Sequence, residues 1–457
     1  MYNTIEFIAF FITLLLLLVI IDHFNANYKL KNIVLLLVCF FFYSLFNIYY
    51  LFILLFVIGY TYIFSILIKK DQSYLKFGII LSIIILALFK YFNFFMDSFY
   101  SLLHISNNPI LNLIAPVGIS FYVFKSISYL VDISRKKIEP EKDIVIVALY
   151  LSYFPEIVAG PISRSNDLMC QLRKNREISI DSLSTGFQIF LFGLFKKIVL
   201  ADNISVFVNE VYRAPRIYSS LTIILCIIAY SIQIYLDFSG YSDMTIGCSK
   251  MLGIDIKKNF NAPYLSHNVT EFWKRWHISL SSWLQDYVYI PLGGNRKGKN
   301  RQYLNLLITM IICGLWHGND ITYIIWGLVN GLALVVHKNY IETKERKDHS
   351  VVSIIITFIF VSLTWVLFRA DNLQNALDVY SSIFNSAGIS FLHINTLVCV
   401  AIFVIVMVII YKKYNSESTY FIQDLNTVKG LVIVIMLIGI IIGFAYTGFN
   451  PFIYSSF

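Results

Sequence analysis

Two histidines, His277 and His317, lie in apolar stretches of the chain, and each directly follows a tryptophan. An ionisable side chain at membrane depth is costly in free energy, so such a residue usually marks a functional site. An imidazole also exchanges a proton near neutral pH, which suits it to act as a general base. The pair therefore predicts chemistry that takes place within a lipid bilayer.

The composition predicts that membrane helices position these histidines. Of the 457 residues, 58% are hydrophobic and 14% are charged, whereas a soluble protein carries about 25% charged residues. The alternation typical of a membrane β-barrel is absent, so we expect an all-α, polytopic fold with about ten to twelve transmembrane helices. The main apolar runs cover residues 7–21, 33–68, 351–368, 397–411 and 431–444.

Charge and motif content exclude several classes of protein. The net charge of +9 is spread over loops, so we expect basic cytoplasmic loops and no nucleic-acid partner. The six cysteines lack C-x-x-C spacing, and no Walker or His-Glu-x-x-His pattern occurs, so we expect no metal site and no nucleotide hydrolysis. The basic loops also predict that residues 450–457 lie on the outer side of the membrane.

The chain is predicted to form a single membrane domain over residues 1–457, with a core at 110–335. Between residues 115 and 326 the apolar runs are repeatedly broken by Gly, Pro, Asn and charged residues. Broken helices at membrane depth require surrounding protein or a water-filled cavity. We therefore expect the middle of the chain to build the working cavity, and the terminal helices to enclose it.

Residues 261–299 carry the densest polar and aromatic chemistry of the chain. From residue 271 to 289 apolar and aromatic residues recur at helical spacing, which predicts one amphipathic helix that contains His277 and ends at Pro291 and Gly293. An ordinary interfacial anchor is the structural alternative for this segment.

His317 lies in the sequence Gly-Leu-Trp-His-Gly, residues 314–318. The flanking glycines allow the close approach of a backbone or a ligand. From the residues alone, His317 is either a catalytic group or a histidine whose hydrogen bonds are satisfied within a helix bundle.

These motifs resemble those of the membrane-bound O-acyltransferase (MBOAT) family, in its bacterial branch of alginate and peptidoglycan O-acetylation proteins. The resemblance extends over most of the chain, with one departure at Lys125, where we expect glutamine in many relatives. The sequence Pro-Leu-Gly-Gly-Asn-Arg favours the O-acetylation branch over the teichoic-acid D-alanylation branch. The similar motifs lie at residues 116–121, 153–161, 193–198, 201–203, 237–243, 272–297, 314–318 and 368–371.

The resemblance implies re-entrant and interfacial helices around a central tunnel, with His317 at its narrow centre. His317 would take the proton from an acceptor hydroxyl as that oxygen attacks an acyl thioester. His277 would polarise the acyl carbonyl or orient the thioester, and Asn319 could help to hold the oxyanion. The candidate substrate-binding residues are Trp316, Asn319, Trp273, Arg275, Trp276 and Asp286.

The resemblance also implies a donor, an acceptor and a location. The donor would be a cytoplasmic acyl thioester, with acetyl-CoA as a substrate and no bound cofactor. The acceptor would be a cell-surface polysaccharide, reached through an extracytoplasmic acetyltransferase partner of the SGNH type. The protein would be a multi-pass component of the bacterial inner membrane.

Four further residues have both a functional and a structural interpretation. Arg296 and Lys297 could meet the phosphates of coenzyme A at the cytoplasmic mouth, although basic residues on that side need no ligand. Asp237 and Asp243 could orient a histidine. They could equally satisfy helix ends and a buried arginine such as Arg275, and we favour this structural use.

Tyr454 lies in the sequence Phe-Ile-Tyr-Ser-Ser-Phe near the end of the chain. A tyrosine at this position could belong to an interfacial aromatic belt. The sequence also resembles the tyrosine-bearing tail that serves as a covalent acyl relay in related surface-acylation systems. On this hypothesis Tyr454 is acetylated with help from His317 and passes acetyl to the outer partner.

Two other classes of function stay open. A lipid or polysaccharide transporter would also contain polar groups in a membrane cavity, and a scaffold protein could keep the fold without activity. Within the acyltransferase class, the transferred group could be D-alanine or a longer acyl chain.

Overall fold

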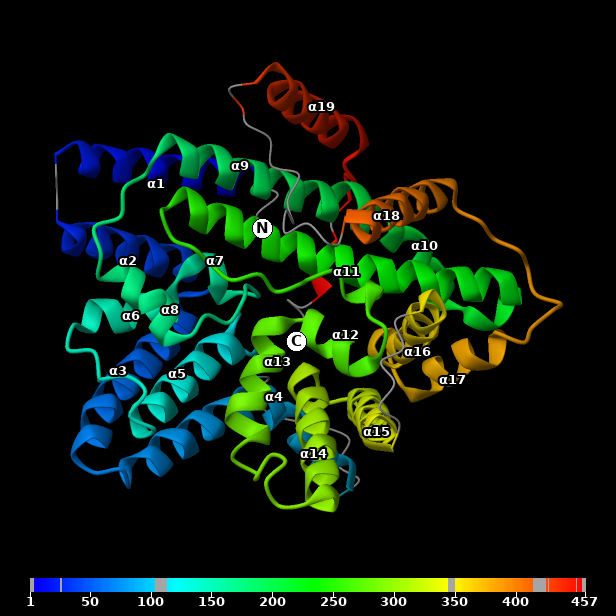
Figure 1. Cartoon of the computed structure of the whole chain (residues 1–457), viewed down its shortest axis with the longest axis horizontal. Helices are drawn as coiled ribbons and strands as arrows, with labels where there is room; N and C mark the ends of the chain where they lie inside the picture. Colours follow the sequence, from blue (N-terminus) through cyan, green and yellow to red (C-terminus); the bar gives the residue numbers. More distant parts are fainter. Residues whose placement is uncertain are drawn as a thin grey trace. The chain divides into compact units, whose positions relative to one another are not determined.

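The structure is a computed structural model that describes residues 4–24, 27–102, 113–343, 350–413, 425, 427–448 and 450–453. These residues are predominantly helical (Figure 1), and their strand-like pairing is one isolated bridge between Tyr218 and Ile389. The predicted all-α fold is confirmed. The chain divides into two compact units, residues 1–186 with 245–257, and residues 187–244 with 258–457.

The first unit contains the early helices of the chain. The apolar run at 33–68 forms two helices, because the first ends at Ser44 and Asn47 caps the second. The Asn47 side chain accepts the backbone N–H of Tyr49 at 2.9 Å, and such caps satisfy the open N–H groups of a helix start. The helices are α1 (Ile5–His23), α2 (Tyr28–Ser44), α3 (Ile48–Lys70), α4 (Tyr74–Leu102), α5 (Ile119–Ser134), α6 (Ile144–Ser152), α7 (Phe154–Ile157) and α8 (Ser165–Leu172).

A buried ion pair joins α5 to α7 within this unit. Lys125 pairs with Glu156, and both side chains are at most 1% exposed. Ser163 also donates its hydroxyl to Glu156, and the Lys125 ammonium donates to the carbonyl of Tyr150 at 3.1 Å. The lysine at this position therefore forms part of a hydrogen-bonded network inside the protein.

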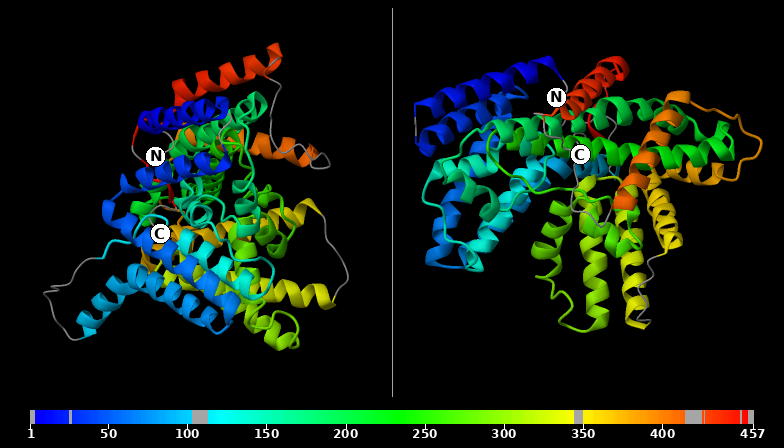
Figure 2. Two further views of the ribbon diagram at one scale, coloured as in Figure 1. Left: turned by 90° about the vertical axis from the view of Figure 1, so that its left-hand side faces the viewer. Right: turned by 45° about the horizontal axis from the view of Figure 1, so that its top comes forward.

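Two helices contribute residues to both units, α9 (Ile180–Leu194) and α11 (Ser220–Met251). Within the second unit, α14 (Lys299–His317) and α15 (Ile321–Thr343) pack side by side (Figures 1 and 2). The remaining elements of this unit are η1 (Phe195–Ala201, a π-helix), α10 (Asp202–Arg213), η2 (Pro215–Ile217), η3 (Pro263–Leu265), α12 (Val269–Arg275), α13 (Ile278–Leu284), η4 (Gln285–Tyr289), α14 (Lys299–His317), α15 (Ile321–Thr343), α16 (Val351–Arg369), α17 (Leu373–Ser382), α18 (Ile394–Lys413) and α19 (Val428–Phe444).

Six helices in the described part of the chain are long and apolar enough to cross a membrane, which confirms a polytopic membrane protein. This number is below the expected ten to twelve, because other helices such as α2 have only 17 residues or carry more polar side chains. Two shorter apolar helices cover 394–409 and 428–444. The six segments are Glu6–His23, Ile48–Lys70, Tyr74–Asn93, Ser220–Met251, Ile321–Tyr340 and Val351–Arg369.

Candidate active site

His317 is the last residue of α14, and aromatic rings enclose its imidazole. The residue is 2% exposed. Its ring centroid lies 4.7 Å from that of Trp316, 4.8 Å from that of Phe368 and 5.3 Å from that of Trp326. All three contacts are edge-to-face, the arrangement that aromatic quadrupoles favour. His317 is therefore held in a fixed orientation within a low-dielectric environment.

The close packing of α14 on α15 places His317 beside Trp326. A Cβ atom on Gly314, one turn before His317, would lie 2.2 Å from the backbone oxygen of Tyr323 in α15. Only glycine permits this approach of two backbones. The close backbone contact expected for the Gly-Leu-Trp-His-Gly motif is thus confirmed at Gly314.

His277 interrupts the helix that the sequence predicted from residue 271 to 289. The chain instead forms α12, α13 and the π-helix η4, with a break at Trp276 and His277. His277 has a φ of 43°, a left-handed conformation that costs a residue with a Cβ free energy. The prediction of one continuous amphipathic helix is wrong, because periodicity does not show where the backbone reverses.

Asn259 holds His277 in this conformation and defines its tautomer. The Asn259 Oδ1 atom accepts the backbone N–H of Ser279 at 3.1 Å and its hydroxyl at 2.9 Å, which identifies that atom as the amide oxygen. Nδ1 of His277 lies 3.1 Å from the same oxygen, so Nδ1 carries the proton and donates it. The residue is 1% exposed, and burial favours the neutral ring, whose lone pair is then on Nε2.

Trp316 brings the two histidines into one cluster. Its ring centroid lies 6.1 Å from that of His277 and 4.7 Å from that of His317. Two motifs that are separate in the sequence, at 272–297 and 314–318, are therefore neighbours in space. The arrangement supplies two imidazoles beside a shared aromatic surface.

The other predicted residues divide into members of the aromatic cluster and exposed positions. Trp273 lies 5.7 Å from Trp326, and Trp276 lies 4.9 Å from Trp365, which itself stacks on Trp326 at 5.6 Å. Both predicted tryptophans therefore belong to the cluster around His317. Tyr454 lies outside the described residues, Asn319, Arg296 and Lys297 are exposed in the loops flanking α14, and Asp286 is half-buried in η4.

Asp237 and Asp243 of α11 form ion pairs with lysines and not with Arg275. The ammonium of Lys197 lies 2.6 Å from Asp237, and that of Lys196 lies 2.6 Å from Asp243. Arg275 forms its ion pair with Glu271 at 2.5 Å, one turn earlier in α12. Structural pairing of both aspartates is confirmed, but the expected arginine partner is wrong because the π-helix η1 presents two adjacent lysines to α11.

Sequence reasoning missed Asn259 and underestimated Phe368 and Trp326. Asn259 is 18 residues from the histidine that it contacts, and no local pattern connects the two. Phe368 lies in the motif 368–371, which contributed to the family resemblance. The residue types of that motif do not indicate that Phe368 contacts His317. These side chains are identified only from the structure, which shows the residue that hydrogen-bonds to His277 and the rings that pack around His317.

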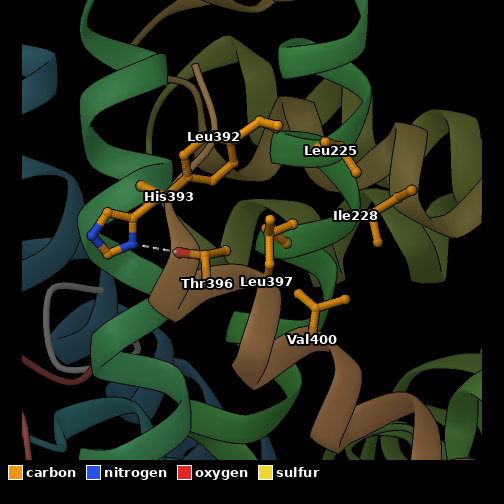
Figure 3. A pocket seen from close by; sticks show the side chains of 9 residues that line it. Leu225, Ile228, Leu392, His393, Thr396, Leu397 and Val400 are labelled. Atoms are coloured by element: carbon orange, nitrogen blue, oxygen red, sulfur yellow. Dashed lines mark hydrogen bonds between the residues drawn. The ribbon is translucent and has the colours of Figure 1, made fainter. Parts of the chain in front are cut away.

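An apolar pocket between α11 and α18 offers a different environment (Figure 3). His393 lines it, and Nδ1 of that histidine bonds to the hydroxyl of Thr396 at 3.1 Å. Aliphatic side chains such as Leu225 and Leu397 make up the rest of its wall. The pocket shares no lining residue with the histidine cluster, and no group of three potential metal ligands occurs among the described residues.

Comparison with known proteins identifies the family. A family model described as MBOAT, membrane-bound O-acyltransferase family, matches residues 134–345. The "Probable alginate O-acetylase AlgI" of Pseudomonas syringae pv. tomato is 36% identical over 373 residues, which cover 79% of this chain and 72% of that protein. This chain belongs to the MBOAT family. The MBOAT resemblance inferred from the motifs is confirmed, and the protein is a multi-pass membrane O-acyltransferase.

Two further relatives differ in the transferred group that their names specify, which is acetyl in one and D-alanyl in the other. The peptidoglycan O-acetyltransferase of Helicobacter pylori is 35% identical over 412 residues, covering 82% of this chain and 78% of that protein. The teichoic acid D-alanyltransferase of Bacillus subtilis is 28% identical over 279 residues, covering 57% of this chain and 70% of that protein. The identity is therefore higher to the probable alginate O-acetylase and to the peptidoglycan O-acetyltransferase than to this D-alanyltransferase.

Proposed function

We propose that this enzyme takes acetyl from a cytoplasmic thioester, acetyl-CoA, and passes it across the bacterial inner membrane. The acceptors are hydroxyl groups of a cell-surface polysaccharide, and an extracytoplasmic acetyltransferase partner of the SGNH type completes the transfer. Similarity to alginate and peptidoglycan O-acetyltransferases supports the acetyl group and the polymeric acceptor. The observation that carries the proposal is the convergence of two buried histidines on Trp316.

His317 acts as the general base in this proposal. The first hydroxyl to react is the phenol of Tyr454: it attacks the thioester carbonyl carbon, a C–O bond forms, and the imidazole accepts the hydroxyl proton. The tetrahedral intermediate then loses the thiolate, which takes the proton back from the imidazolium. The aromatic enclosure of His317 excludes competing water, which would otherwise hydrolyse the thioester.

His277 orients a substrate by accepting a hydrogen bond. Because its Nδ1–H is donated to Asn259, the neutral ring presents a lone pair at Nε2. A lone pair cannot polarise an acyl carbonyl, which requires a donor. Of the two roles expected for His277, the tautomer therefore supports orientation of a donor group on the substrate.

Tyr454 carries the acetyl group between the two membrane faces. Its phenol attacks the thioester with His317 as base, giving an O-acetyl tyrosine and a free thiol. A hydroxyl on the outer side then attacks this ester and releases the phenol, whose ordinary pKa near 10 makes it a good leaving group. The relay explains how an inner donor supplies an outer acceptor.

The decisive experiment measures transfer of labelled acetyl from acetyl-CoA by the full chain in lipid nanodiscs. We expect His317→Ala to lower the turnover by about 10²–10⁴-fold, the usual contribution of a general base. His393→Ala is the matched control, because it removes a histidine that lines the apolar pocket of Figure 3. Turnover by His317→Ala equal to that of wild type would contradict the assignment of His317 as the general base.

Two further measurements test the transferred group and the Tyr454 relay independently of the role of His317. Replacing the acetyl thioester by a D-alanyl thioester tests the transferred group, and faster D-alanyl transfer would overturn the acetyl assignment. Mass spectrometry of the peptide that contains Tyr454 tests the relay. We expect an added acetyl mass in wild type and none in Tyr454→Phe, whereas unmodified Tyr454 during turnover would contradict the relay.

A further inference from the structure

The chain that follows α19 returns to the π-helix η1. We call residues 445–448 and 450–453 the post-α19 segment. The backbone N–H of Tyr446 donates to the carbonyl of Ile198 at 2.9 Å, and the side-chain amide of Asn203 donates to the carbonyl of Phe444 at 3.1 Å. These bonds connect the end of α19 to residues more than 200 positions earlier. The segment is therefore attached to the protein at its first residues.

The last described residues of this segment bind a charged cluster beside α11 (red in Figure 1). The Asn450 side chain donates its amide to Asp202 Oδ1 at 2.9 Å, and the Ile453 backbone N–H donates to Asp237 Oδ2 at 2.9 Å. The Lys197 ammonium also donates to the backbone oxygen of Asn450 at 3.4 Å. We call Lys197, Asp202 and Asp237 the carboxylate dock.

The charges of the carboxylate dock explain why it binds hydrogen-bond donors. Lys197 lies 2.7 Å from Asp202 and 2.6 Å from Asp237, so two carboxylates share one ammonium. All three side chains are at most 6% exposed. Buried carboxylates require donors for their remaining lone pairs. The post-α19 segment supplies two such donors without adding charge.

An aromatic contact continues the attachment toward His277. Phe452 stacks on Tyr241 with centroids 4.5 Å apart and an interplanar angle of 22°. The same ring lies 5.7 Å from Phe238, and the Phe238 ring lies 4.6 Å from that of His277. One aromatic side chain therefore contacts both the post-α19 segment and a histidine of the candidate active site.

We propose that the carboxylate dock is a positioning site that holds the post-α19 segment beside Phe238, so that the residue after Ile453 can take part in acyl transfer. This inference rests on the proposed relay at Tyr454. Lys197, Asp202 and Asp237 act through the segment that they hold. Loss of the dock therefore slows acylation of Tyr454 without removing the histidines.

The test uses Asn450→Asp, which places a third carboxylate beside two that share one lysine. Repulsion between these charges releases the segment, and the substitution leaves α10, α11 and η1 unchanged in sequence. The double variant Asp202→Asn with Asn450→Asp exchanges donor and acceptor and restores the original charge. Asn372→Asp is the matched control, because this exposed residue caps α17, where aspartate serves as well as asparagine.

Hydrogen–deuterium exchange of the peptide 445–457 reports docking, and single-turnover acetylation of Tyr454 reports function. In Asn450→Asp we expect faster amide exchange in this peptide and at least about tenfold slower acetylation, corresponding to about 1.4 kcal/mol. The double variant should recover both, and Asn372→Asp should match wild type in both. Thermal unfolding of each variant shows whether the rest of the protein stays folded.

The possible outcomes separate the dock from the relay. If the peptide 445–457 exchanged its amides at the wild-type rate in Asn450→Asp, the dock would be overturned. Faster amide exchange with an unchanged rate of Tyr454 acetylation would overturn it as well. Failure of the double variant to recover protection in a folded protein would also overturn it. In a further outcome, Tyr454 of the wild type carries no acetyl, but the segment is protected, is released by Asn450→Asp and is protected again in the double variant. That outcome would contradict the relay and leave the dock supported.

Discussion

His277 donates its Nδ1–H to the amide oxygen of Asn259 across 3.1 Å, in a site where both residues are 1% exposed. This bond fixes the ring of a histidine whose backbone has a left-handed φ of 43°. The backbone N–H of Ile278 also donates to the carbonyl of Asn259 at 2.9 Å. Asn259 therefore sets both the tautomer of His277 and the direction in which its Nε2 lone pair points.

Asn259→Leu removes the acceptor at similar volume and frees the imidazole to adopt either tautomer. We expect turnover of acetyl-CoA to fall by at least about tenfold, since a wrongly protonated histidine cannot perform its role. Asn259→Asp keeps an oxygen acceptor and should retain most of the activity. Steady-state kinetics over a range of pH checks both variants, and equal turnover of Asn259→Leu and wild type would show that the tautomer does not matter.

Lys125→Met leaves Glu156 in the interior without its cation. Breaking a buried pair in this way lowers the free energy of unfolding by about 3–5 kcal/mol. The double variant Lys125→Gln with Glu156→Gln removes both charges and should recover most of that loss, since two neutral amides can hydrogen-bond to each other. Thermal unfolding followed by tryptophan fluorescence provides the measurement. The ion-pair explanation fails if the double variant is as unstable as Lys125→Met.

Gly193→Ala tests the close crossing of α9 and α11. A Cβ on Gly193 would lie 2.5 Å from the carbonyl oxygen of Gly240, so we expect a destabilisation of about 1–3 kcal/mol from overpacking. Gly439→Ala is the control, because nothing lies within 4 Å of the added Cβ in α19. There alanine should stabilise the helix by up to about 1 kcal/mol. If Gly193→Ala and Gly439→Ala shifted the unfolding temperature in the same direction, this explanation would be contradicted.

Arg296 and Lys297 are exposed in the loop before α14, where they could meet the phosphates of coenzyme A. Replacing both by glutamine should raise the KM for acetyl-CoA a few-fold, since exposed charge pairs contribute about 0.2–1 kcal/mol each. Acetyl-pantetheine lacks these phosphates and serves as the control substrate. If the KM rose equally for both thioesters, Arg296 and Lys297 would act through their charge in general and not through contact with the phosphates.

The sequence alone determined the class of the protein and most of its family motifs. A high content of apolar residues excludes a soluble fold, and two Trp-His motifs in apolar surroundings indicate a membrane active site. These features are local, because each depends on the residue types within a short stretch of chain. The all-α membrane fold and the acyltransferase family were accordingly predicted and are confirmed.

Only the tertiary structure decided which residues hold the histidines and what fills the space around them. The break at His277 depends on Asn259, 18 residues earlier, and the bond from Ile453 to Asp237 spans 216 residues. Periodicity carries no information about such pairs, because a buried polar group takes whichever partner the packing brings within hydrogen-bond distance. Backbone reversal at a non-glycine residue likewise follows from long-range bonds that outweigh a local preference.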